Sequence, residues 1–232
     1  MGELVAERIA RSRVLEKYGI DYCCGGDKPL TDACALRGIP VEEVLADLNE
    51  AELALPETED IDYNSMVLDQ LVDHILSTHH AYLAEELPRL LGLAKKVAKA
   101  HADSDPRVPE FTSLVRALVE ELNMHLGKEE QILFPFILQI VRSDTLPMMP
   151  FGTIANPIAA MESEHDSAGE ALRRLRILSD DYTEPAWACD TYRALLDGLR
   201  GFELDLHQHI HKENNILFHK VIALEHQREE QG

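Results

Sequence analysis

The residues best suited to bind a metal ion occur in a motif that this chain contains twice. Residues 125–129 (His-Leu-Gly-Lys-Glu) and 209–213 (His-Ile-His-Lys-Glu) share the pattern His-x-x-Lys-Glu, and each is followed after two residues by Ile-Leu-Phe. In a helix, four residues advance the chain by about 400° and about 6 Å, so each histidine and its glutamate lie on one face, one turn apart. Two such faces could hold metal ions between them.

A further histidine precedes each motif at nearly the same distance. His80 lies 45 residues before His125, and His165 lies 44 residues before His209. This spacing predicts a helical hairpin duplicated in tandem. Antiparallel hairpins pack into a four-helix bundle, in whose core facing side chains can build a two-metal site.

The duplicated positions predict a site with two metal ions. We expect two bridging carboxylates, Glu129 and Glu213, and four terminal histidines. Imidazole and carboxylate ligands without nearby thiolates suit iron or manganese better than structural zinc, and we favour iron. These ligands do not fill the coordination sphere of either ion, which leaves open positions for an oxo or hydroxo bridge, water or a diatomic molecule. The predicted ligands are His80, His125, Glu129, His165, His209 and Glu213.

Several neighbouring residues compete for roles at this site. His79 is the alternative to His80, and one of Glu130, Glu162 and Glu164 could orient a ligand or carry protons. The other histidines have no counterpart in the repeat, and we expect them to be solvated or to pack behind the ligands. These are His74, His101, His207, His211, His219 and His226.

Two adjacent cysteines, Cys23 and Cys24, precede two glycines and form a second candidate site. Adjacent cysteines do not form an ordinary disulfide without strain. Three roles remain open: thiol redox chemistry, transient binding of iron, and docking to a cysteine-rich partner. The alternative is a buried turn in which the sulfur atoms only pack. For the isolated Cys34 and Cys189, ordinary packing is the better interpretation.

The chain divides at an acidic, proline-marked segment. We predict a small helical domain at 1–56, a linker at 57–62 and a four-helix bundle at 63–232. In the small domain, helices are expected from Glu3 to Tyr18, from Thr31 or Asp32 to Arg37, and after Pro40. The bundle helices are expected at about 65–100 with a bend near Pro88, 109–142 with a bend or break at Pro135, 157–178 and 184–228.

The composition supports an all-α protein and excludes some partners. Aromatic residues are only 6% of the chain, and helix-period patterns dominate. Asp and Glu outnumber Lys and Arg by 42 to 22, giving a formal charge of −20 that disfavours nucleic acid and anionic membranes. We find no signal peptide and no apolar run long enough to span a membrane, so we expect a cytoplasmic protein with reduced cysteines.

The motifs resemble those of the repair-of-iron-centres family. The resemblance is carried by residues 21–26 (Asp-Tyr-Cys-Cys-Gly-Gly), residues 161–166 (Met-Glu-Ser-Glu-His-Asp) and the second His-x-x-x-Glu motif with its Asn-Asn-Ile-Leu-Phe extension. It covers nearly the whole chain and implies a small N-terminal domain of the ScdA type followed by a hemerythrin-like bundle. His219 departs from the pattern, because a proline often follows the phenylalanine, as Pro135 does in the first motif.

The resemblance also implies a function. Family members are cytoplasmic, commonly dimeric di-iron proteins that restore iron–sulfur clusters damaged by nitric oxide or oxidants. The family's ligands fall on the six residues that the repeat selects, and its cysteine pair falls on Cys23 and Cys24. We therefore expect an iron donor to damaged iron–sulfur proteins or their scaffold. The alternatives are an enzyme or sensor that binds or reduces nitric oxide or dioxygen, and a metal-free interaction bundle.

Overall fold

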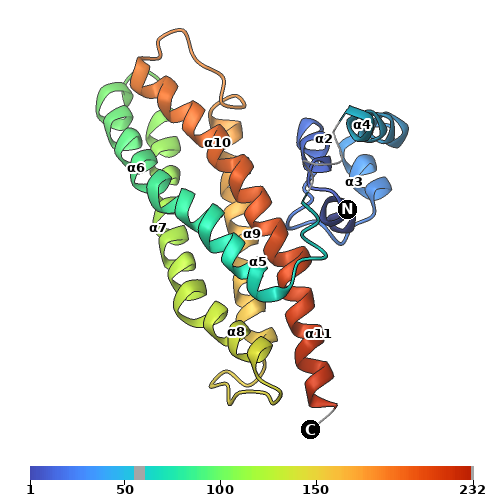
Figure 1. The fold of residues 1–232 in the computed structure, drawn as a ribbon. Helices are drawn as coiled ribbons and strands as arrows, with labels where there is room; N and C mark the ends of the chain where they lie inside the picture. Colours follow the sequence, from blue (N-terminus) through green and yellow to red (C-terminus); the bar gives the residue numbers. More distant parts are fainter. Residues whose placement is uncertain (55–60, 231–232) are drawn as a thin grey trace. The chain divides into compact units, whose positions relative to one another are not determined.

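The fold is all-α, as predicted. The computed structural model describes residues 1–54 and 61–230, and within these ranges it contains helices and no strand (Figure 1). The predicted linker lies mostly outside the described residues. No helix in the described part of the chain is both long enough and apolar enough to cross a membrane.

The chain forms two compact units. The first comprises Met1–Asp73, Ile140–Pro147 and His207–Gly232, and the second comprises His74–Gln139 and Met148–Leu206. Two helices, α5 (Leu68–Ile75) and α10 (Asp190–Lys212), have residues in both units.

Four short helices open the first unit. They are α1 (Gly2–Glu7), α2 (Arg11–Lys17), α3 (Leu30–Arg37) and α4 (Val41–Ala54). Helices α2 and α3 pack on α4, with Leu15 and Val44 completely buried. Gly38, with φ +67°, ends α3 in the left-handed conformation that favours glycine. The predicted helix ending at Arg37 and the helix after Pro40 are both confirmed.

The single helix predicted from Glu3 to Tyr18 is wrong. Arg8 is extended, with φ −153° and ψ 103°, and separates α1 from α2. Arg11 Nη1 donates a hydrogen bond of 2.8 Å to the Leu4 carbonyl oxygen. This bond satisfies a carbonyl group at the end of α1, so the chain can leave the helix there without a glycine or proline to signal it.

The second unit is a four-helix bundle. Its long helices are α6 (Ala81–His101), α7 (Val108–Lys128), α9 (Ala155–Leu178) and the part of α10 that ends at Leu206. Helix α7 packs against both α6 and α9. Helix α10 lies against α9, where Arg176 pairs with Glu203 at 2.8 Å, and against α6, where Gly198 leaves room for Leu90. The four helices therefore enclose one apolar core, as the duplicated hairpin predicts.

Short π-helical segments interrupt three of the predicted long helices. They are η1 (Leu76–His80), η2 (Glu129–Leu133) and η3 (Glu213–Leu217). The chain enters η1 from α5 and leaves η2 and η3 through α8 (Phe134–Arg142) and α11 (Phe218–Glu229). Single π turns occur frequently at functional sites, and each of these three begins or ends at a predicted metal ligand.

The prolines do not explain these π segments. Helix α6 continues through Pro88, and the π segment in the first predicted bundle helix lies at 76–80, well before that proline. Pro135 stands in the first turn of α8, directly after η2. However, η3 is followed in the same way by α11, in which His219 replaces the proline. The π turn therefore forms without it.

Candidate metal centre

Three buried side chains in the second unit direct ligand atoms toward one point. His125 Nε2 lies 3.0 Å from His165 Nε2 and 3.3 Å from Glu129 Oε1. One suitable atom from each of the three residues lies within 4.8 Å of those of the other two. His125 and Glu129 lie one turn apart at the end of α7 and the start of η2, while His165 projects from the middle of α9.

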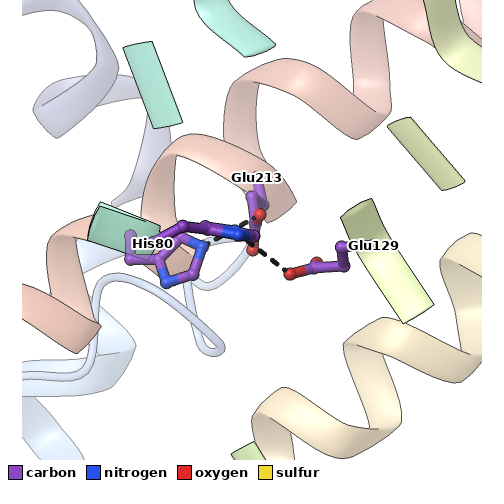
Figure 2. Close-up of side chains that lie close together, drawn as sticks. His80, Glu129 and Glu213 are labelled. Carbon is purple, nitrogen blue, oxygen red and sulfur yellow. Dashed lines mark hydrogen bonds and ion pairs between the residues drawn. The ribbon is translucent and has the colours of Figure 1, made fainter. Parts of the chain in front are cut away.

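His80 approaches the same carboxylate with its own ring. Its Nε2 atom lies 3.5 Å from Glu129 Oε2 (Figure 2). The Glu129 side chain is 0% exposed, and neither of its oxygens has a hydrogen-bond partner among the described residues. Burying a carboxylate away from water is costly unless a positive charge compensates it. A cation between Glu129 and the imidazoles would supply that charge.

Carboxylates hold two of these histidines from behind. Glu130 Oε1 lies 2.8 Å from His80 Nδ1, and Glu164 Oε2 lies 2.9 Å from His125 Nδ1. A carboxylate acceptor at Nδ1 favours the tautomer with its proton there, which leaves the Nε2 lone pair for a metal ion. The sequence left this role open among three acidic residues, and the structure assigns it to two of them.

Glu164 also pairs with Lys128, which belongs to the first His-x-x-Lys-Glu motif. Burial would raise the pKa of Glu164, but the hydrogen bonds from Lys128 and His125 outweigh it and lower the pKa below its usual value. Glu164 therefore stays ionised and remains an acceptor for the His125 ring.

His79 forms a hydrogen bond with a different carboxylate. Its Nδ1 atom lies 2.8 Å from Asp205 Oδ1 on α10. His80, and not His79, lies beside Glu129. Asp205 was missed because 126 residues separate it from His79 and no motif connects them.

The second motif forms a similar pair in the first unit. His209 Nε2 lies 3.0 Å from Glu213 Oε1, and both side chains are completely buried. His211, between them in sequence, is also buried, and its ring lies 5.5 Å from that of Tyr22. Burial lowers the pKa of His211 to about 4, so this ring is neutral near pH 7.

The cysteines are all free thiols. Cys23 is buried and Cys24 is half-buried, with 3.9 Å between their sulfur atoms. Ordinary packing was predicted for Cys189, but its sulfur lies 3.1 Å from His101 Nε2. The hydrogen bond from His101 and the backbone N–H groups of Tyr192 and Thr191 lower the pKa of Cys189 to about 7.

A cavity of about 190 Å³ reaches His125 and His165 within the second unit. Apolar side chains, including Leu118, Leu122 and Ala168, line part of it, and Lys128 and Glu164 also contribute. A cavity of this size admits water or a diatomic molecule.

Comparison with known proteins identifies the family of this chain. Residues 71–221 match the hemerythrin HHE cation binding domain. The chain belongs to the hemerythrin family. Its N-terminal residues 1–52 match a second domain family, ScdA_N, described as a domain of unknown function. The oxygen and nitrogen donors assembled around Glu129 agree with a cation-binding member of the hemerythrin family.

The chain is similar to named proteins over nearly the whole of the given sequence. The iron–sulfur cluster repair proteins YtfE of Escherichia coli O157:H7 and of Shigella boydii serotype 4 are each 40% identical to this chain over 224 residues. The matches cover 96% of this chain and 96% of each relative. This hemerythrin-family chain therefore shares both of its domains with proteins named for cluster repair.

Proposed function

We propose that this protein repairs iron–sulfur clusters damaged by nitrosative or oxidative stress, by supplying iron from a di-iron centre. The observation that carries the proposal is the full-length similarity to proteins named for iron–sulfur cluster repair, together with the buried histidine and carboxylate groups around Glu129. The expected clients are damaged iron–sulfur proteins or the scaffold on which clusters are assembled.

The proposed centre uses the six residues that the duplicated motif and its upstream histidines predict, His80, His125, Glu129, His165, His209 and Glu213. We assign the four histidines as terminal ligands and the two glutamates as bridges between two iron ions, which an oxo or hydroxo group would also bridge. When bound, the iron ions are the cargo of the protein and supply the coordination chemistry of the reaction. The protein supplies the imidazole and carboxylate ligands, and Glu130 and Glu164 orient the rings of His80 and His125.

Neutral histidines and carboxylates are suited to an ion that has to be released. They bind divalent iron less tenaciously than a closed set of thiolates binds a soft metal ion, and protons compete with iron for the imidazoles. A donor of iron requires this combination of retention and release. We also propose that the protein acts in the cytoplasm as a homodimer, which light scattering on the purified chain would test.

A repair assay tests the proposal. An enzyme whose iron–sulfur cluster has been damaged by nitric oxide is incubated with the iron-loaded protein, and its recovered activity is measured. We expect recovery that an equal amount of ferrous salt without the protein does not reproduce. The Glu213→Ala variant should fail, and the exposed Glu120→Ala variant should behave like the natural chain. Equal recovery from ferrous salt alone would refute the proposal.

One observation favours a second function. The cavity that reaches His125 and His165 could lead nitric oxide or dioxygen to the metal ions. In that case the protein would bind or reduce the molecule itself. Rapid mixing of the reduced, iron-loaded protein with nitric oxide distinguishes the two functions, because formation of nitrous oxide with turnover supports the second and a site that does not react with nitric oxide excludes it.

A further inference from the structure

We propose that Asp21, Cys23 and Cys24 form a second metal site, which binds one thiophilic divalent cation through both sulfur atoms. We assign the cation as ferrous iron that is leaving the histidine and glutamate centre. This assignment rests on the function proposed above.

A single carboxylate oxygen shapes this loop. Asp21 Oδ1 accepts hydrogen bonds from the backbone N–H groups of Cys23, Cys24 and Gly25 at 3.2, 3.0 and 3.2 Å. Three successive N–H groups directed at one oxygen curl the backbone tightly. As a result, two adjacent side chains that would diverge on an extended strand lie on the same side of the loop.

The distance between the sulfur atoms fits a chelated ion. Cys23 Sγ and Cys24 Sγ are 3.9 Å apart. A disulfide would need about 2.0 Å. Two thiolates bound tetrahedrally to one ion, each at about 2.3 Å, lie about 3.8 Å apart. The pair is therefore spaced for a shared metal ion without a change in the backbone.

Asp21 provides a third ligand atom, an oxygen, beside the two sulfur atoms. A carboxylate oxygen and both sulfurs lie within 4.8 Å of one another. The Cys23 thiol donates a hydrogen bond of 3.3 Å to Asp21 Oδ1, and a bound cation would replace that proton.

The position of the loop suits a transfer role. Asn215 Nδ2, on η3, donates a hydrogen bond of 2.9 Å to the Cys23 carbonyl oxygen. Asn215 lies two residues after Glu213, so the segment that carries the proposed iron ligand also holds the cysteine loop. Cys24 is half-buried, which leaves one side of the site open to an incoming or departing ion.

Cobalt titration tests this site directly. Co²⁺ is added under anaerobic conditions to the full chain carrying Glu129→Ala and Glu213→Ala, in which the main centre is disabled. We expect one tightly bound Co²⁺ per chain with a thiolate-to-cobalt charge-transfer band. Cys23→Ser and Cys24→Ser should each remove the band and weaken binding about tenfold or more. Cys34→Ser, which changes a cysteine elsewhere in the small domain, should have no effect. If circular dichroism shows that the disabled chain is unfolded, the iron-loaded natural chain is titrated instead.

A titration without the thiolate band, a band that survives both serine substitutions, or one ion shared by two chains would overturn the second site. Asp21→Asn keeps the oxygen that holds the loop but loses the charge, so unchanged Co²⁺ affinity in this variant would overturn the role of Asp21. The two proposals fail separately. Cobalt binding at the cysteines without any cluster repair refutes the repair function alone, and repair by a chain that lacks the band refutes the second site alone.

Discussion

The Glu129 carboxylate is completely buried, and neither of its oxygens has a hydrogen-bond donor among the described residues. A carboxylate is costly to bury unless a cation lies beside it. We therefore predict that Glu129→Gln makes the metal-free protein more stable, by about 1–3 kcal/mol, because an amide is less costly to bury than a carboxylate. The same variant should lose most of the stabilisation that iron gives the natural chain.

Chemical denaturation with and without iron measures both effects. Glu120→Gln, an exposed change on α7, serves as the control and should change neither value. A metal-free Glu129→Gln protein that is less stable than the natural chain would contradict this interpretation of the buried carboxylate.

Cys189 should react as a thiolate at neutral pH. The pKa of Cys189 is lowered to about 7, most of all by the hydrogen bond from His101. The reactive thiolate is therefore lost as the pH falls through 7, and conversion to the thiolate is nearly complete at pH 8. We predict that the rate of alkylation by iodoacetamide at Cys189 rises with a midpoint near pH 7. His101→Phe should move the midpoint up toward the ordinary cysteine value of about 8.5. An unchanged midpoint in this variant would show that His101 does not set the pKa.

At the scale of the elements, the cysteine loop and η3 fit together only because Gly26 lacks a side chain. A Cβ atom on Gly26 would lie 2.9 Å from the Tyr22 carbonyl oxygen and would overlap Asn215. We predict that Gly26→Ala destabilises the protein by about 1–3 kcal/mol, because backbone or Asn215 has to move. The measurement is the free energy of unfolding in urea.

A helical glycine with free space around it provides the matched control. Gly92 in α6 has no neighbour within 4 Å of an added Cβ. Gly92→Ala should therefore stabilise the protein by about 0.5–1 kcal/mol, through the better helix propensity of alanine. Equal effects of the two substitutions would show that the Gly26 contact does not constrain the loop.

The helices themselves could be predicted because apolar periodicity and the duplicated motif are visible in a single sequence. The π segments could not, since a change from i→i−4 to i→i−5 hydrogen bonding hardly alters which residues are apolar. The break at Arg8 was missed for a similar reason: a long side chain, Arg11, satisfies the end of α1 instead of a glycine or proline. The spacing of the repeat predicts His80 as a ligand, whereas Asp205 could be found only once the fold brought it to His79.

At the scale of the whole molecule, the chain combines two domain families in one polypeptide. The hemerythrin domain supplies histidines and carboxylates for hard or intermediate ions, and the ScdA_N region supplies two adjacent thiols. Full-length similarity to the cluster repair proteins shows that this combination is shared with its relatives. An iron donor needs one site that stores the ion and a route by which the ion leaves, and the two domains offer ligands for each.

The iron content of the purified chain tests the central claim most directly. Elemental analysis after anaerobic loading with ferrous iron should find about two iron ions per natural chain, the number for which two carboxylate bridges and four histidines are suited. Glu129→Ala and Glu213→Ala should each reduce this number to below one, while Glu120→Ala should retain two. A natural chain that binds no iron, or glutamate variants that keep the full amount, would contradict the assignment of the di-iron centre to these residues.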